Sequence, residues 1–304
     1  MAALWLVVAI AAVALQFSLE AHERRTVGLL TSERGQQRAL ALGALAMTQA
    51  RLDEALRVAP SSSNLNVQRL RASDPWLDAD SLYSGTVMVD SVPVDVVAHD
   101  VGASLNINLL TETDVRTFFS YLLGDYTKAT QLAQAILDWR DADSIPRPSG
   151  AERDAYIKAE LLALPTNAPF RKVEDLRNVM GMTPEIYAQA SPYLTTHGNG
   201  QVNLNMAPVP VLRALPGMTD AMLNTILQMR SQGRRIDQPG EVLSRRGGGR
   251  GGQSTSAISF GGRSTTRTNT IELVITARVG PQSQPTKLTV VLSRDNVTFP
   301  TLEW

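Results

Sequence analysis

The sequence contains no cysteine and only three histidines among its 304 residues. Without cysteine, the chain can form no disulfide, no thiolate metal site and no cysteine nucleophile. The histidines, His22, His99 and His197, are far apart in the sequence, which disfavours a histidine-rich metal site or a histidine-based triad. Lysine plus arginine and aspartate plus glutamate both number 29. The formal net charge of zero therefore provides no overall basic field to attract nucleic acid or an anionic membrane.

The sequence also lacks the common catalytic motifs. It contains no G-x-S-x-G, no H-E-x-x-H and no phosphate-binding P-loop. Paired carboxylates could act as general acid and base, but no other feature of the sequence supports a hydrolase. We therefore expect a protein that is not an enzyme and assign no catalytic residue.

The N-terminal segment 2–19, AALWLVVAIAAVALQFSL, carries no charge. As a helix rising about 1.5 Å per residue, it would span roughly 27 Å, close to the thickness of a bilayer's hydrocarbon core. A cleaved signal peptide is the alternative, with AVA at 12–14 as its cleavage site, but no basic region precedes the apolar run. We expect a retained membrane anchor over residues 1–20. Its anchor residues are Leu4, Trp5, Val8, Ile10, Leu15 and Leu19.

The helical pattern continues beyond this apolar run. No proline occurs before Pro60, and apolar residues recur near the helical period at Leu40, Ala44 and Met47. The pattern predicts one helix from about residue 2 to residue 58, with an amphipathic part over 21–58.

Two regions rich in β-branched residues flank a long helical region. Residues 84–100 predict a hairpin, with Pro93 at an edge position or a bulge. Helix starts are predicted at TETD (from residue 111), SGAE (from 149) and TPE (from 183). The glycine-rich stretch 244–256 predicts a flexible loop, and two further strands flank PQSQP. One antiparallel sheet explains this order best, because two separate sheets would each have too few strands to be stable.

We therefore predict an α+β fold with a long N-terminal helix and an antiparallel sheet that is split by a large all-α insertion. The predicted parts are the transmembrane segment 1–20, the amphipathic helix 21–58, the first part of the sheet 59–103, the inserted helical domain 104–243, and the glycine-rich loop with the C-terminal strands 244–304.

The helical region contains a weak internal repeat. Residues 103–122 parallel residues 200–218, and each begins with an apolar-Asn-apolar-Asn step. The aligned pairs are Asn106 with Asn203 and Asn108 with Asn205. Because asparagine side chains readily bond nearby backbone, we expect these steps to open each helical unit. Each unit then leads through a second helix to a similar end, ILDWRD in the first and ILQMRSQG in the second.

The segment LPGMTDAMLNTIL, residues 215–227, resembles a helix-hairpin-helix module, whose Pro-Gly turn offers backbone N–H groups to a phosphate. DNA-binding versions surround that turn with basic residues, but here Asp220 follows it, and Glu185 follows a similar turn. We favour a compact helical packing unit without a nucleic-acid partner. The alternative is a membrane-anchored helix-hairpin-helix DNA-binding protein. The basic run with Arg245, Arg246 and Arg250 is interpreted as a solvated loop.

Four carboxylates cluster in ILDWRDADSIPRPSGAE: Asp138, Asp141, Asp143 and Glu152. Acids near a helix C-terminus are unfavourable unless something offsets them. One interpretation is a solvated turn, followed by a capping box with Ser149 as N-cap and Glu152 as its partner in a helix starting near Ala151. The other is a Ca²⁺ site, because Ca²⁺ prefers several carboxylate and carbonyl oxygens, although the spacing does not match an EF-hand. All four acids are carried as candidate calcium ligands.

Several stretches together resemble one family, the type II secretion system protein K, a minor pseudopilin. They are LWLVVAIAAVALQFSLEAHE, DVGASLNINLL, ILDWRDADSIPRPSGAERDAY, LPTNAPFRKVEDLRNVMGMTPEIYAQASPYLTT and GQVNLNMAPVPVLRALPGM, and they cover most of residues 4–218. The DWRDAD and GAERDAY strings and the two asparagine steps are fairly specific, whereas many pilin-like proteins share the N-terminal helix.

The resemblance implies a pilin-like protein with a single inner-membrane span and a globular part in the periplasm. It implies a place at the tip of a pseudopilus, where the protein would initiate pseudopilus assembly and support export of folded proteins across the outer membrane. The implied partners are the minor pseudopilins I and J, other pseudopilus subunits and secreted substrates. Members of this family resemble calcium-binding proteins in this region, so the resemblance also implies a calcium site at the acid cluster.

Pseudopilins are made with a short basic leader, which a prepilin peptidase removes after a glycine. No such leader precedes Ala2, which leaves open whether the true start lies upstream or the leader is absent. Orientation cannot be inferred from flanking charge, because no lysine or arginine precedes the apolar span.

Overall fold

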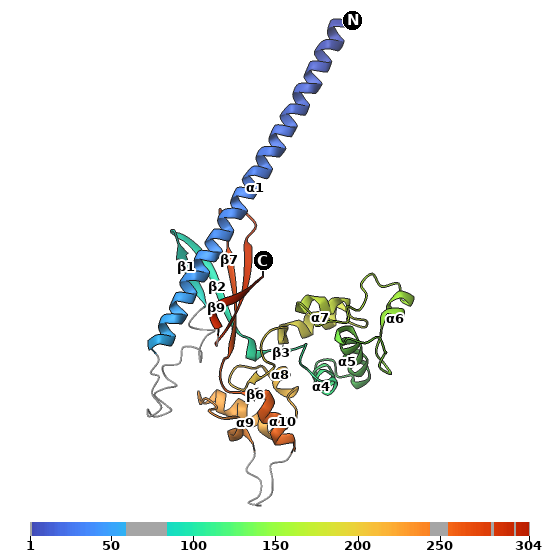
Figure 1. Cartoon of the computed structure of the whole chain (residues 1–304), viewed down its shortest axis with the longest axis vertical. Helices are drawn as coiled ribbons and strands as arrows, with labels where there is room; N and C mark the ends of the chain where they lie inside the picture. Colours follow the sequence, from blue (N-terminus) through green and yellow to red (C-terminus); the bar gives the residue numbers. More distant parts are fainter. Residues whose placement is uncertain (1, 59–83, 244–254, 281–282, 295, 304) are drawn as a thin grey trace, which may run out of the picture.

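The computed structural model describes residues 2–58, 84–243, 255–280, 283–294 and 296–303 (Figure 1). Helix α1, Ala2–Val58, forms one continuous rod of 57 residues whose N-terminal half stands clear of the rest of the chain. Proline would break such a helix by removing a backbone N–H and clashing with the preceding turn, and none occurs within it. The prediction of one helix from about residue 2 to residue 58 is confirmed.

Within the part of the chain that the structure describes, no helix is both long and apolar enough to cross a bilayer. Of the predicted anchor side chains, that of Leu15 is described and is 63% exposed. The other five, Leu4, Trp5, Val8, Ile10 and Leu19, have side chains outside the described part. Anchoring by this segment therefore stays a prediction. The predicted glycine-rich loop also lies outside the described residues over 244–254, with its three arginines.

Five strands form one antiparallel sheet in the order β1-β2-β7-β8-β9. They are β1 Gly85–Val89, β2 Val92–Asp100, β7 Thr270–Ala277, β8 Thr286–Ser293 and β9 Asn296–Glu303. Strand β2 pairs with β7 from Asp95↔Thr276 to Asp100↔Ile271, although the whole helical region separates them in sequence. The predicted single sheet, split by an insertion, is confirmed by this pairing. Pro93 lies ahead of the stretch paired with β7, so its missing N–H removes no hydrogen bond to that strand.

Helix α1 packs on one face of the sheet and forms the first hydrophobic core. Alternate residues of β7, such as Ile271, Leu273 and Ile275, are completely buried, as period-two burial requires. Small residues on α1 allow close approach, because a Cβ on Gly43 would lie 2.8 Å from Cγ1 of Val89. Each fully buried aliphatic side chain contributes about 1.5–3 kcal/mol to stability, so this layer fixes the helix on the sheet.

The chain between β2 and β7 forms a helical insertion at the end of the sheet remote from the N-terminus of α1 (Figure 1). Its first unit consists of η1 Val101–Ala103, β3 Leu105–Asn106, α4 Glu112–Leu123, α5 Tyr126–Arg140, α6 Arg153–Lys158, η2 Val173–Asn178, α7 Pro184–Ala190, η3 Ser191–Tyr193 and β4 Leu194–Thr195. Its second unit consists of β5 Val202–Asn203, α8 Val209–Arg213, α9 Asp220–Ser231, η4 Pro239–Val242, α10 Thr255–Arg263 and β6 Ser264–Thr265. A single hydrophobic core runs through both units. Helix α10 was not predicted; it begins at the end of the expected loop.

The asparagine steps make equivalent hydrogen bonds in both units. The side-chain oxygen of Asn106 accepts the N–H of Asn108 at 3.0 Å, and Asn203 accepts the N–H of Asn205 at the same distance. The Asn108 amide then bonds both the N–H and the C=O of Phe170, at 2.8 and 2.9 Å. The Asn205 amide likewise bonds both the N–H and the C=O of Ile236. These contacts confirm the expected role of the asparagines, since each one ties a unit's first turn to a later loop.

A partly buried arginine closes each unit at the end of its second helix. Arg140 donates to the backbone carbonyls of Ile107 and Leu110, while Arg230 donates to those of Leu204 and Ala207. Burial is the main cause that lowers the pKa of Arg140 to about 10 and also lowers the pKa of Arg230. Both units also end in a two-residue parallel ladder, β3 with β4 and β5 with β6. The weak sequence repeat is therefore a repeat of one structural unit.

A buried carboxylate joins the insertion to the sheet. Asp100, at the end of β2, is 3% exposed and accepts hydrogen bonds from the N–H of Gly102, the amide of Asn203 and the hydroxyl of Thr268. These partners come from the start of the first unit, the start of the second unit and the approach to β7. Since charge-assisted hydrogen bonds are the strong ones, this junction holds both units against the end of the sheet.

Candidate functional site

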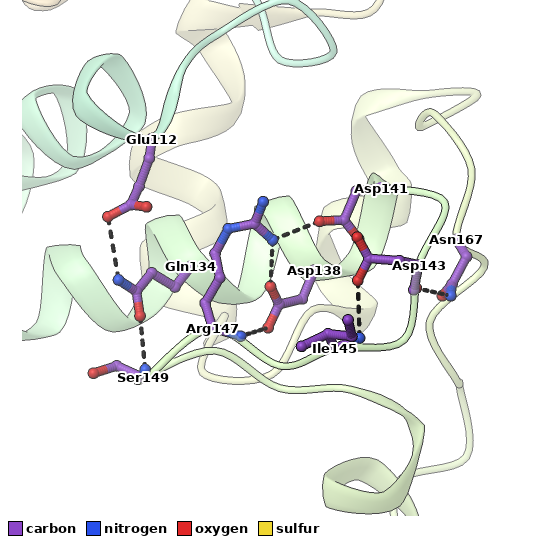
Figure 2. Close-up of polar contacts among 9 residues, drawn as sticks. All are labelled: Glu112, Gln134, Asp138, Asp141, Asp143, Ile145, Arg147, Ser149 and Asn167. Carbon is purple, nitrogen blue, oxygen red and sulfur yellow. Dashed lines mark hydrogen bonds and ion pairs between the residues drawn. The ribbon is translucent and has the colours of Figure 1, made fainter.

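The acid cluster lies where α5 ends and the chain runs through an extended loop to α6. Figure 2 shows three of its acids, Asp138, Asp141 and Asp143, between the last turn of α5 and this loop. The helix around it is held by the core of the first unit, because Trp139 is 2% exposed and its ring lies parallel to that of Phe170, with centroids 6.3 Å apart. Tyr156 of α6 is completely buried, and its hydroxyl accepts the N–H of Met180 at 2.7 Å. The acids therefore sit on a fixed scaffold.

Asp138 is completely buried and is neutralised by Arg147 (Figure 2). The guanidinium Nη1 lies 2.5 Å from Oδ1 of Asp138, and the backbone N–H of Arg147 donates to Oδ2 at 3.1 Å. The same Nη1 lies 2.5 Å from Oδ2 of Asp141. An arginine nine residues further along the chain thus supplies the positive charge that acids at a helix C-terminus require. Of the four predicted acids, Asp138 is the one with both carboxylate oxygens bound by this arginine, whereas Asp141 uses one.

The other three predicted acids converge. Asp141, Asp143 and Glu152 each offer a carboxylate oxygen within 4.8 Å of the others. Glu152 is 6% exposed, and neither of its oxygens has a hydrogen-bond partner among the described residues. The Oδ1 of Asp141 is also buried and unpartnered within the described part of the chain. Buried carboxylate oxygens without partners are costly, and a cation coordinated by them would offset that cost.

The electrostatics agree with that interpretation. Burial raises the pKa of Glu152, and the negative charges of Asp138, Asp141 and Asp143 raise it further, although the nearby backbone N–H of Arg153 acts to lower it. Partial burial alone would lower the pKa of Arg147, but its hydrogen bonds to Asp141 and Asp138 outweigh burial, and its pKa is raised. The cluster therefore disfavours the ionised form of Glu152 and stabilises the positive charge of Arg147 beside it.

Three carboxylates of this kind fit a hard cation that prefers oxygen ligands. Ca²⁺ takes six to eight oxygens at about 2.3–2.6 Å and accepts carboxylates with one or both oxygens. Asp143 is exposed and keeps the site open to solvent, while the amide of Asn167 bonds its backbone carbonyl and fixes the loop (Figure 2). If a cation binds, Asp141, Asp143 and Glu152 would hold it, and it would supply charge neutralisation and cross-linking of the loop rather than chemistry.

The capping interpretation of this segment is wrong. Helix α6 begins at Arg153, Glu152 occupies its N-cap position, and the Glu152 side chain makes no capping hydrogen bond. The N–H of Ser149 instead donates to the side-chain oxygen of Gln134 at 2.7 Å, which ties the loop to α5 (Figure 2). The capping prediction failed because the proline-containing loop turns Glu152 inward. The helix starts expected at Thr111 and Thr183 are confirmed, because both threonines cap their helices, and Pro184 occupies the first position of the second helix.

The sequence analysis also missed Arg147 and Gly150. Arg147 is the one basic residue of the loop between Asp141 and Glu152, and that isolated charge was the available signal. Gly150 lies against Asp138, because a Cβ at this position would be 2.0 Å from Oδ2 of Asp138. Glycine thus allows the loop to cross the buried carboxylate.

The helix-hairpin-helix turn carries no free positive charge at the start of its second helix. Gly217 has φ 76° and allows the turn, and α9 begins at Asp220. Arg213 pairs with Asp220 at 2.9 Å and lies over the ring of Tyr121. The N-terminus of α9 is therefore occupied by a carboxylate of the chain itself, which agrees with a packing unit.

Comparison with known proteins shows what parts of this chain are similar to. A family model described as Type II secretion system (T2SS), protein K matches residues 103–199, the first unit that contains the acid cluster. This segment of the chain, about a third of its length, is therefore similar to the type II secretion system protein K family. The curated protein K of Pectobacterium carotovorum subsp. carotovorum is 28% identical over 116 residues, 36% of this chain and 35% of the relative. That of Klebsiella pneumoniae is 35% identical over 80 residues, 26% of this chain and 24% of the relative.

A likeness in fold extends beyond the matched segment. A chain of the GspK-GspI-GspJ complex from enterotoxigenic Escherichia coli superimposes with a TM-score of 0.65 at 16% identity, covering 90% of this chain and 98% of that chain. This likeness shows a shared fold. By sequence, the chain spans between 24% and 35% of the length of the curated protein K relatives that it matches.

Proposed function

We propose that this chain is a minor pseudopilin of a type II secretion system and that it sits at the tip of the pseudopilus. There it initiates pseudopilus assembly and supports export of folded proteins across the outer membrane. The observation that carries the proposal is the order of the elements. One long N-terminal helix precedes an antiparallel sheet, and the segment similar to protein K is inserted between two neighbouring strands of that sheet. The role is structural: it requires packing surfaces and no catalysis.

The long helix supplies the assembly surface in this proposal. Beyond the sheet, α1 carries exposed apolar side chains at Val27, Leu29 and Leu30, which are 62%, 56% and 51% exposed. Exposed apolar residues that cluster on one element favour burial against a partner. In a filament, the α1 helices of neighbouring subunits would cover these side chains. Upstream of them, the apolar segment 2–19 would anchor the chain in the inner membrane as a single span, with the globular part in the periplasm.

The helical insertion supports the tip position. It lies at the end of the sheet opposite the N-terminus of α1 (Figure 1). A subunit added beyond that end would meet the insertion, which lies there next to the sheet (Figure 1). Subunits can therefore be added on the membrane side only, as a tip subunit requires. The partners that fit this arrangement are the minor pseudopilins I and J, because the solved relative of the same fold assembles with GspI and GspJ. Other pseudopilus subunits and secreted substrates would follow as further contacts.

Complex formation tests this proposal. The tagged full-length chain, co-expressed in its host with the I- and J-type pseudopilins of the same system, should copurify with both from detergent-solubilised membranes. Replacing Leu29 and Leu30 by aspartate should reduce that recovery at least about tenfold, since each buried leucine contributes about 1.5–3 kcal/mol. The matched control is Leu162→Asp, a fully exposed leucine of the insertion, which should leave recovery unchanged. Purification of the chain without either partner would refute the proposal.

The second part of the proposal is a Ca²⁺ site at Asp141, Asp143 and Glu152, with Asp138 as the residue that holds the neighbouring arginine. Its support is the buried, unpartnered oxygens of Glu152 and Asp141. Calcium that binds the folded chain stabilises it by about 2.7 kcal/mol at one hundred times Kd. The full-length chain should therefore melt at a lower temperature in EGTA than with calcium. An unchanged melting temperature, with no calcium found by elemental analysis, would remove the site.

A further inference from the structure

Arg147 has a place in the proposed cation site that goes beyond neutralising Asp138. One guanidinium nitrogen bridges two carboxylates, with Nη1 at 2.5 Å from Oδ1 of Asp138 and at 2.5 Å from Oδ2 of Asp141 (Figure 2). Asp138 is an internal residue without exposure, whereas the Asp141 side chain is 25% exposed and belongs to the converging acids. Arg147 therefore spans the structural acid and one acid of the proposed site.

The bridge from Arg147 removes one carboxylate oxygen from those available to a bound cation. Ca²⁺ prefers six to eight oxygens, and three carboxylates supply six only if every one of them uses both oxygens. Both oxygens of Glu152 are unpartnered among the described residues, as is Oδ1 of Asp141. The remaining oxygen of Asp141, Oδ2, is bound by Arg147. Oδ1 of Asp143 accepts the N–H of Ile145 at 2.9 Å, and water or backbone carbonyls can complete the shell of a bound Ca²⁺. A cation that takes both oxygens of Asp141 competes with Arg147 for Oδ2, and any cation here is repelled by the charge of Arg147.

The two bonds of the bridge differ in how easily they can be given up. Loss of the guanidinium from Asp138 would leave a completely buried carboxylate without its counter-charge, which is strongly unfavourable. Loss of the guanidinium from Asp141 would be offset directly by the cation. Arg147 itself is 30% exposed, so its side chain has solvent on one side, and its backbone N–H stays bonded to Asp138 at 3.1 Å. The loop can therefore stay in place while the guanidinium shifts.

We propose that Arg147 is a built-in competitor of the cation, which holds Asp141 when no cation is bound and releases it, while keeping Asp138, when one binds. This inference rests on the cation site proposed above. The device keeps the acid loop folded without a cation and sets a ceiling on cation affinity. Arg147 is thus an affinity-determining residue, whereas Asp141, Asp143 and Glu152 are the ligands.

Calorimetric titration of the full-length chain in detergent with CaCl₂ tests the inference. Arg147→Gln should bind Ca²⁺ at least about fivefold more tightly than wild type, because a unit positive charge next to the site is removed. Arg147→Lys keeps the charge and should stay within about threefold of wild type. The matched control is Arg153→Gln, which removes an exposed charge next to Glu152 outside the bridge and should change affinity less than about twofold.

Thermal melting separates competition from a merely structural role. Arg147→Gln should melt below wild type under both conditions, because Asp138 loses its counter-charge. If Arg147 also holds Asp141 in the cation-free state, this deficit should be clearly larger in EGTA than in saturating calcium. Equal lowering under both conditions, or affinity that is unchanged or weaker in Arg147→Gln, would overturn the inference. Absence of calcium binding to wild type in the same titration would instead refute the proposed site, and the inference with it.

A measurement on wild type covers the case in which Arg147→Gln does not fold. In protein labelled with ¹⁵N-arginine, the Nε–Hε resonance of Arg147 can be assigned by its absence in Arg147→Lys. Saturation with calcium should shift this resonance, while that of Arg230, which binds backbone carbonyls in the other unit, should stay in place. A stationary Arg147 resonance in a protein that binds calcium would contradict the release of Asp141.

Discussion

Replacing Gly150 by alanine is the sharpest perturbation of the acid loop. A Cβ at this position would lie 2.0 Å from Oδ2 and 2.8 Å from Cγ of Asp138, and 3.2 Å from Cβ of Arg147. Real Cβ contacts essentially never fall below 3.0 Å, so either the loop or the aspartate must move by about 1 Å or more. Asp138 cannot yield freely, because it is completely buried on the last turn of α5.

The size of the effect follows from what that movement breaks. The hydrogen bonds from Arg147 to Asp138 are 2.5 and 3.1 Å long, and a displacement of about 1 Å takes the longer one beyond the range of a hydrogen bond. Overpacking by one methyl group costs typically 1–3 kcal/mol, and breaking a buried ion pair costs about 3–5 kcal/mol. Because the two terms overlap, we expect Gly150→Ala to lower the free energy of unfolding by about 3–5 kcal/mol.

Urea unfolding in the presence of EGTA, followed by the fluorescence of buried Trp139, measures this loss. Gly240→Ala is the matched control, because a Cβ there meets nothing within 4 Å and the backbone is not left-handed. The control should stay within about 0.5 kcal/mol of wild type, as surface substitutions usually do. A Gly150→Ala protein as stable as the control would refute the close packing of the loop against Asp138.

Three further changes test other parts of the account, each by urea unfolding. The pKa of Glu152 is raised in the folded chain, so in EGTA its ionised form opposes folding. Wild type should therefore gain stability as pH falls from neutral through that pKa, and Glu152→Gln should lack this gain. The same pH dependence in both proteins would contradict this. Arg140→Met and Arg230→Met should each lower the free energy of unfolding by about 2–4 kcal/mol, because in each case two backbone carbonyls lose a charged donor. A large loss for one variant and none for the other would show that the two arginines are not equivalent. Tyr156→Phe should cost about 1–2 kcal/mol by leaving the N–H of Met180 unpaired, so a neutral change would argue against that bond.

The sequence predicted most of what depends on local pattern. The length of α1 followed from the absence of proline and the spacing of apolar residues, and the split sheet followed from alternating β-branched residues on both sides of the helices. The asparagine steps were found because Asn106 and Asn203 do local backbone work that their sequence context signals. Short features carried too little pattern: the two-residue ladders β3–β4 and β5–β6 and helix α10 were missed.

The candidate site was predicted as a set of residues but not as an arrangement. The four acids were adjacent in sequence, yet which of them converge depends on the path of the loop through Pro146 and Pro148. That path carries Arg147 back to Asp138 and turns Glu152 inward, away from the capping position expected for it. Pairing across a loop is set by tertiary packing, and no periodicity in the sequence reports it.

The position of this chain in the filament is the central claim, and immunogold labelling of pseudopili tests it most directly. An epitope placed on the α6 side of the insertion, for example at exposed Leu162, should remain accessible in an assembled filament. In bacteria that overproduce the system, the account predicts a single gold label at one end of each pseudopilus and none along its length. Labels spaced along the filament, or filaments of normal number in cells without this chain, would contradict it.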